Sequence, residues 1–363
     1  MKNYLANILL IPLVALALTP PIFFKLDCLV NSTAWLLAIF VSGFLAFLFL
    51  NFKVSIWLKL LVIWCFVSCF LSRAPFISFT LNWSVIFCAY YYVACTKIKD
   101  FTPVKRVVQA IFFFVTLLII MQLFGKDTLL NFGLKTPVIL GTVGNSMISS
   151  SYVCTMAPFL IVSPLNWILL LLIAFISKSS GAVLAIFMGL LVIVWAKLKR
   201  WRMGLTILLV IIPLLFAFKT GKIKTFGGNA SRRLVWTKSI ELTLKRPIGY
   251  GGATWKILFP YMCGKEISEQ QPGREWARAH CFPIQLAFEL GIPGLILFIG
   301  WITSIAVKVI KSKNYIKLAG LSIIVGTSMV HFPDRMVNSV LILVMFLAWL
   351  SSDSHERQYD YYC

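Results

Sequence analysis

Long apolar runs recur along almost the whole chain, and they limit its possible folds more than any other feature. Between Tyr4 and Leu350, such runs are separated by short polar segments. Each is about 17 to 22 residues long, and a helix of about 20 residues crosses the roughly 30 Å hydrocarbon core of a bilayer. Backbone polar groups in lipid must pair within their own segment, so the runs are expected to be helices. The composition agrees, since 60% of the residues are hydrophobic and 13% are charged.

Twelve spans can be drawn from this pattern. They cover residues 4–24, 33–50, 54–72, 76–95, 107–124, 147–163, 165–177, 180–196, 203–218, 283–301, 315–332 and 336–350. The short pair 147–163 and 165–177 also fits a single re-entrant unit, which would change the count but not the sidedness of the flanking spans. The pattern predicts an all-α, polytopic integral membrane protein, with about 12 transmembrane helices in one membrane domain over residues 1–363.

Basic residues in short loops predict the orientation, because Lys and Arg there resist translocation. One set of loops is rich in them, with Lys53, then Lys97, Lys99, Lys105 and Arg106, then Lys197, Lys199, Arg200 and Arg202, then Lys308, Lys311, Lys313 and Lys317. The opposite loops carry single charges such as Lys25, Arg73, Lys126 and Lys178. The first set is predicted to be cytoplasmic, with both termini and the tail 351–363. Residues 219–282 then form one large periplasmic loop, since long loops translocate regardless of charge.

The predicted periplasmic loop is basic and aromatic. It contains twelve Lys or Arg against four Glu. Its apolar residues between Leu234 and Leu244 fit a helix with one hydrophobic face, which would suit the membrane interface. Arg246 and Pro247 are expected to end this helix. Residues 248–252, Ile-Gly-Tyr-Gly-Gly, are typical of a turn that lets backbone approach a ligand closely.

Charge and cysteine usage narrow the possible partners. The formal charge of +22 is compatible with nucleic acid, but about half of it lies in the loops that set the topology, so nucleic acid is not expected as a partner. Membrane lipids are expected. The cysteines lack the spacing of a zinc site, so no metal is predicted. Cys263 and Cys281 share the outer loop, where a disulfide is possible but not required.

His280 is the histidine best placed for chemistry. It ends the string 274–280, and the next helix is expected at about Pro283, a residue that favours the first helical turn. The positive end of that helix and the nearby Arg278 favour the neutral imidazole, which can act as a base. The alternative is an interfacial histidine that only hydrogen-bonds the helix end. The other two histidines lie in the tail and at the outer end of a span.

Several basic residues of the outer loop suit phosphate oxygens. They are Arg232, Arg233, Lys245, Arg246, Arg274 and Arg278. Anionic lipid headgroups offer an alternative explanation for some of them. Glu289 is an ionisable group near the bilayer, roughly two turns beyond His280. Carboxylates are costly to bury in a membrane, so Glu289 is expected to have a function. A structural pairing of Glu289 with a basic residue is the alternative.

Five short strings of residues stand out, and together they cover about residues 141 to 300. They are Gly141-Thr142-Val143-Gly144-Asn145; Ser177-Lys178-Ser179-Ser180-Gly181-Ala182; Arg232 four residues before Trp236; Arg246-Pro247-Ile248-Gly249-Tyr250-Gly251; and Ala279-His280 followed by Gln285, Glu289-Leu290-Gly291 and Gly294. In their kind and order, these strings resemble the O-antigen ligase and O-antigen polymerase superfamily of bacterial membrane glycosyltransferases.

The resemblance implies a reaction at the periplasmic face of the bacterial cell inner membrane. A glycan passes from undecaprenyl-pyrophosphate to an acceptor sugar, on the lipid A core or on a growing polysaccharide, without a cofactor. In the implied inverting displacement, His280 deprotonates the acceptor hydroxyl. Arg232, with Arg233, Arg278 or Lys178, holds the pyrophosphate as charge develops on it. The family often has an arginine where Ser180 stands, so Lys178 would supply that cation. Arg246 and Glu289 complete the expected substrate-binding set.

Two other functional classes also suit a cationic, many-spanning chain. A transporter or lipid-glycan flippase would place charges in a cavity near the bilayer midplane. The predicted spans here are nearly free of charge in their interiors. A non-catalytic membrane scaffold would account for the fold but not for the ordered strings. The sequence therefore favours the transferase, with the transporter as its main alternative.

Overall fold

A computed structural model describes the chain over residues 55–75, 78, 85, 88–89, 91–98, 100–124, 146–161, 163–197, 230–270, 278–330 and 337–352. All regular structure in these residues is helical, and no strand occurs among them. The all-α prediction is therefore confirmed for this part of the chain. The predicted spans 4–24, 33–50 and 203–218, and most of 76–95, lie outside the described residues.

Most of the described helices overlap predicted spans, and two lie within the predicted outer loop. Their bounds are α3 (Ile56–Phe70), α5 (Thr102–Leu123), α6 (Ser146–Leu160), α7 (Pro164–Ile176), α8 (Ser180–Lys197), α10 (Ala230–Lys245), α11 (Trp255–Gln270), α12 (Phe282–Lys311), α13 (Tyr315–Val330) and α14 (Val337–Ser351). The doubtful pair of short spans forms two separate helices, α6 and α7. Helix α12 continues ten residues beyond the predicted end at residue 301.

Two of the described helices, α5 and α12, are long and apolar enough to cross a membrane. Shorter apolar helices make up most of the remainder, including α3, α7 and α8. The helices thus indicate a membrane protein, while the number of twelve spans stays a prediction.

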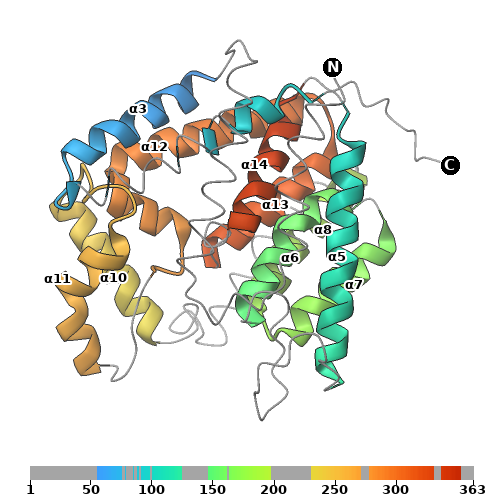
Figure 1. Ribbon diagram of the computed structural model, residues 1–363, viewed down its shortest axis with the longest axis horizontal. Coiled ribbons are helices and arrows are strands. Elements are labelled where there is room, and N and C mark those ends of the chain that lie inside the picture. Colours follow the sequence, from blue (N-terminus) through green and yellow to red (C-terminus); the bar gives the residue numbers. More distant parts are fainter. Residues whose placement is uncertain are drawn as a thin grey trace.

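The larger part of the structure is a bundle of α5, α6, α7, α8, α13 and α14 (Figure 1). Small residues let its helices approach closely, as is usual for helix pairs in membranes. A Cβ atom on Gly189 of α8 would lie 2.4 Å from the Ile323 side chain of α13, and one on Gly320 would lie 2.8 Å from Pro158 of α6. The contacts of α13 with α8 and with α6 therefore depend on glycine.

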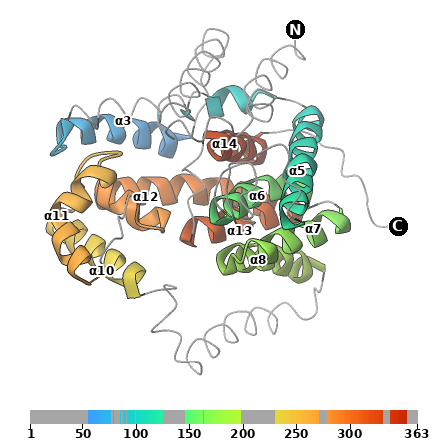
Figure 2. The same cartoon turned by 60° about the horizontal axis from the view of Figure 1, so that its bottom comes forward.

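Helices α10 and α11 form a smaller part of the structure with the first half of α12. They lie beside one end of α12, apart from α5 and α7, in both views (Figures 1 and 2). Their own apolar core contains Val235, Leu242, Tyr250, Trp255, Phe259, Cys263, Ile267, Ala279 and Phe288. Trp255 stacks on Phe259 with ring centroids 4.2 Å apart. The described part of the predicted outer loop is therefore packed around a core of its own.

Three lysines of the predicted cytoplasmic loops meet at the end of α14. The Lys308 ammonium donates a hydrogen bond to the Ser351 carbonyl, and the Lys317 ammonium donates one to the Trp349 carbonyl. Lys105 and Lys317 lie over the Trp349 ring at 4.5 and 4.7 Å. Basic groups suit the negative end of a helix, so these lysines also fasten α14 in place. The compartment that this end faces stays a prediction.

Candidate functional site

The segment Arg246–Gly251 is inserted into a break in helix α12. Gly291 has φ 71° and ψ −176°, which interrupts the helix. At the break, the Tyr250 amide donates to the Phe288 carbonyl at 3.0 Å, the Gly251 amide to the Glu289 carbonyl at 2.8 Å, and the Ile292 amide to the Pro247 carbonyl at 2.8 Å. The string 246–251 and the string that includes 289–291 thus form one unit, in which backbone groups of one string hydrogen-bond to backbone groups around the other.

Glycines make this insertion possible. Gly249 and Gly291 both adopt positive φ, at 85° and 71°. A Cβ atom on Gly249 would lie 2.4 Å from the Gly291 nitrogen, and one on Gly291 would lie 2.3 Å from the Pro247 carbonyl oxygen. The sequence predicted a glycine-rich turn for close approach to a ligand. The described contact of this turn is with the protein's own backbone.

The Glu289 carboxylate holds the start of helix α11. Its oxygens accept hydrogen bonds from the Ala253 amide at 3.1 Å and from the Trp255 amide at 3.2 Å. The Gln285 side chain donates a third at 3.2 Å. Amides at a helix start lack partners within the helix, so a carboxylate there is a strong cap. These bonds give Glu289 a structural role, and its contact with a substrate stays a prediction.

The loop before α12 presents His280. The Trp236 indole of α10 donates a hydrogen bond of 2.6 Å to the Ala279 carbonyl, and Ala279 itself is buried. His280 follows in a left-handed backbone conformation, φ 56°. The next helix begins at Phe282 with Pro283 in its first turn, as predicted. The same backbone conformation occurs at Ala253 and Lys313, so the catalytic role of His280 stays a prediction.

The predicted arginines differ in their surroundings. Arg232 is partly buried in the first turn of α10, and burial lowers the pKa of its guanidinium from the ordinary value. Arg233 beside it is exposed. Arg278 precedes the His280 loop and interacts electrostatically with the Glu289 carboxylate. Since Arg232 lies one helical turn before Trp236, the indole bond joins the helix of Arg232 to the loop of His280.

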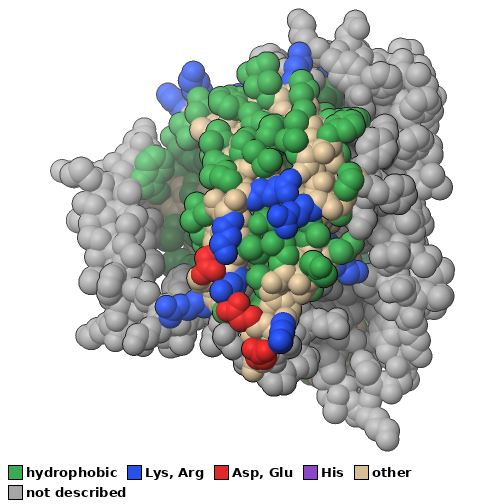
Figure 3. Space-filling view, turned by 90° about the vertical axis from the view of Figure 1, so that its left-hand side faces the viewer, with side chains coloured by type: hydrophobic (Ala, Val, Ile, Leu, Met, Phe, Trp, Pro, Cys, Tyr) green, Lys and Arg blue, Asp and Glu red, His purple; other side chains and the backbone are tan. Residues whose placement is uncertain are grey.

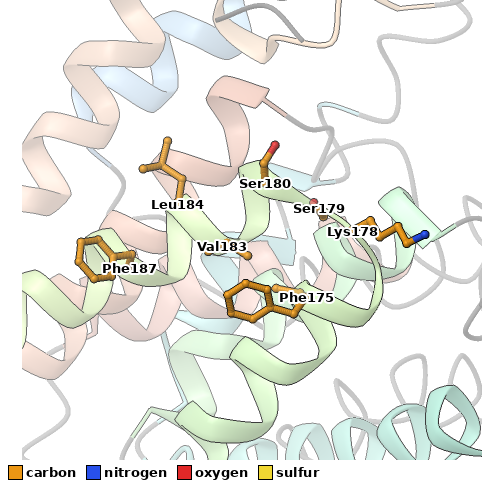
Figure 4. Close-up of a pocket in the computed structure, with 8 residues that line it drawn as sticks. Phe175, Lys178, Ser179, Ser180, Val183, Leu184 and Phe187 are labelled. Atoms are coloured by element: carbon orange, nitrogen blue, oxygen red, sulfur yellow. The ribbon is translucent and has the colours of Figure 1, made fainter. Parts of the chain in front are cut away.

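Lys178 lies in the turn between α7 and α8. It also adopts a left-handed conformation, φ 51°, and is exposed. It forms the polar end, with Ser179 and Ser180, of a pocket of about 500 Å³ whose remaining lining is apolar. Figure 4 shows Phe187 at the other end of this pocket. An ammonium beside an apolar groove suits an amphiphilic ligand, although contact between Lys178 and a pyrophosphate stays a prediction.

Sequence reasoning missed two parts of the site. Helix α11 was not predicted, because Pro260 and Gly264 lie within it. The contribution of α3 was also missed. The Ser72 hydroxyl and the Arg73 amide donate to the Tyr250 carbonyl at 2.9 and 3.2 Å. Cys263 and Cys281 do not form the disulfide that the sequence left open, since both thiols are free and buried.

Comparisons with known proteins agree with the predicted resemblance. Residues 165–299, from α7 to the middle of α12, match the family described as O-antigen ligase. No curated protein matches the chain. Four of the five family-like strings fall within the matched segment, which confirms the resemblance to the O-antigen ligase and polymerase superfamily. At this general level the match supports a membrane glycosyltransferase that uses lipid-linked glycans.

Proposed function

We propose that this chain, which carries an O-antigen ligase domain at residues 165–299, transfers a glycan from undecaprenyl-pyrophosphate to an acceptor sugar. The acceptor is the lipid A core or a growing polysaccharide. The reaction takes place at the periplasmic face of the bacterial inner membrane, with both termini in the cytoplasm. The residues over which the family matches contain His280, Arg232 and Lys178, which supports assigning the chemistry to them.

One contact carries the proposal. The bond from the Trp236 indole to the Ala279 carbonyl makes the helix of Arg232 and the loop of His280 parts of one scaffold. A base and a cation held on the same scaffold can act on the two ends of one displacement. The acceptor hydroxyl loses its proton to the His280 imidazole and forms the new bond to the anomeric carbon.

The leaving group requires the cations. As the bond between the anomeric carbon and the pyrophosphate oxygen breaks, that oxygen gains negative charge, and the bonding electron pair leaves with it. Arg232 is the leading candidate to hold this charge, because a partly buried guanidinium acts in a medium that screens it less than water. Arg233, Arg278 and Lys178 are the candidates for a second contact with the pyrophosphate.

A reconstituted assay separates this function from transport. The purified protein in lipid nanodiscs receives a lipid-pyrophosphate-linked glycan and an acceptor sugar lipid. The transferase releases the carrier pyrophosphate and yields a glycosylated acceptor, both measurable by mass spectrometry. In sealed vesicles, a flippase would move the intact donor between leaflets without cleaving it. Movement without cleavage would overturn the proposed reaction.

A further inference from the structure

The face around the Tyr250 side chain carries a second group of cations, distinct from those near His280. Arg73, after α3, and Arg246, after α10, each place the central guanidinium carbon 5.6 Å from the Tyr250 ring centroid. Tyr250 stacks on Phe288 with ring centroids 4.6 Å apart, so one face of its ring is covered. Both guanidinium groups therefore approach the remaining face, and their carbons are at most about 11 Å apart.

The two positive charges have no carboxylate partner in the part of the chain that the structure describes. Among the described residues, neither Arg73 nor Arg246 forms an ion pair, whereas Lys238 pairs with Glu241 and Glu266 on α10 and α11. Figure 3 shows basic side chains in the middle of the face formed by the ends of α3, α10 and α11, with acidic side chains to one side. Two like charges around one ring repel each other, and an anion bound between the two guanidinium groups would reduce this repulsion.

The Arg246 side chain is held in place by one hydrogen bond, and one of its donors has no partner among the described residues. Its guanidinium donates to the Leu71 carbonyl, which joins the loop to the end of α3. Its Nε atom is buried and has no hydrogen-bond partner among the described residues. Because Nε is buried, a ligand oxygen would instead accept hydrogen bonds from the terminal nitrogens of the guanidinium.

The surroundings indicate which anion fits. Phe70, Leu71 and Ile248 are exposed apolar side chains next to the two arginines. Phe70 ends an apolar helix, and the break at Gly291 lies in one of the two helices suited to crossing a membrane. Apolar side chains beside guanidinium groups at the end of an apolar helix match the headgroup level of a bilayer.

We propose that Arg73 and Arg246 form a binding site for the phosphate group of a membrane lipid, with Tyr250 between them as the platform. The phosphate oxygens accept hydrogen bonds from both guanidinium groups, and the acyl chains lie along Phe70, Leu71 and Ile248. Arg246 also belongs to the expected substrate-binding set, and the test below therefore measures lipid binding alone, without the glycan donor. The inference does not depend on the proposed transfer reaction.

Lipid binding to the full-length protein tests the site without any transfer step. Native mass spectrometry in detergent measures the Kd for dioctanoyl phosphatidic acid, for dioctanoyl phosphatidylcholine and for inorganic phosphate. We expect saturable binding of phosphatidic acid, weaker binding of phosphatidylcholine, and an increase in Kd of about tenfold or more for Arg73→Gln, since a charge-assisted hydrogen bond is lost. Lys256→Gln removes an exposed charge of α11 and should leave the Kd unchanged.

Arg246 needs a second variant, because its bond to the Leu71 carbonyl also supports the fold. Arg246→Lys keeps the charge and removes the fork, so it should weaken phosphatidic acid binding while the protein stays folded. Arg73→Gln with an unchanged Kd would overturn the proposal. Inorganic phosphate that binds as tightly as phosphatidic acid would overturn the assignment to a lipid.

Discussion

Gly249 and Gly291 meet backbone to backbone, and neither position has room for a side chain. We expect Gly291→Ala to destabilise the protein by at least about 2 kcal/mol, because an L-residue is strained at φ 71° and its Cβ would collide with the Pro247 carbonyl. Thermal unfolding in detergent measures the effect. Gly264→Ala is the matched control, since that Cβ would meet nothing within 4 Å in the middle of α11. It should stabilise by about 0.5–1 kcal/mol. Equal midpoints for both variants would contradict this description of the break.

Trp236 positions His280 through the Ala279 carbonyl. Trp236→Phe keeps an aromatic ring and removes the hydrogen bond, which should cost about 0.5–1.5 kcal/mol of stability. Transfer should fall about tenfold or more in kcat, because small shifts of a catalytic group are expensive. Steady-state kinetics at a temperature where both proteins are folded provides the measurement. Tyr261→Phe, on an 87% exposed side chain of α11, serves as the control and should change neither value. A variant with full kcat would show that the indole bond does not serve catalysis.

Glu289 is predicted to stabilise the fold by capping the start of α11. Glu289→Gln weakens the acceptor for the Ala253 and Trp255 amides, so we expect a loss of about 1–3 kcal/mol. Glu241→Gln breaks only a surface ion pair with Lys238 on a 47% exposed side chain, and should cost about 1 kcal/mol or less. Chemical denaturation compares the two. A Glu289 variant as stable as the Glu241 variant would exclude the capping role.

Arg232 and Arg233 offer a paired test of the pyrophosphate assignment. Both substitutions to lysine keep the charge, but only Arg232 is partly buried. We expect Arg232→Lys to reduce kcat/KM by about tenfold or more through loss of forked donors, and Arg233→Lys to have a smaller effect. Donor cleavage, followed by mass spectrometry, measures both. The reverse order would move the assignment to Arg233.

The parts of the site governed by local signals were predictable. Pro247 after a basic run placed the end of α10, and Pro283 placed the start of α12. The parts that depend on distant contacts were not. The bond from the Ser72 hydroxyl to the Tyr250 carbonyl joins residues 178 positions apart. The pattern of apolar residues in either segment gives no indication of this long-range hydrogen bond.

Helix α11 shows a different reason for failure. Pro260 and Gly264 argue against a helix on local propensity. Packing overrides them, because Trp255, Phe259 and Cys263 lie one turn apart on the face that is buried against α10 and α12. Tertiary contacts therefore decided this element.

Transfer by a His280→Ala variant tests the central claim most directly. General-base assistance contributes about 100- to 10,000-fold. The variant should therefore lose that factor in glycan transfer while it inserts into the membrane and unfolds at the temperature of the unmodified protein. A His280→Ala protein that transfers glycan at the unmodified rate would contradict the assignment of His280 as the base.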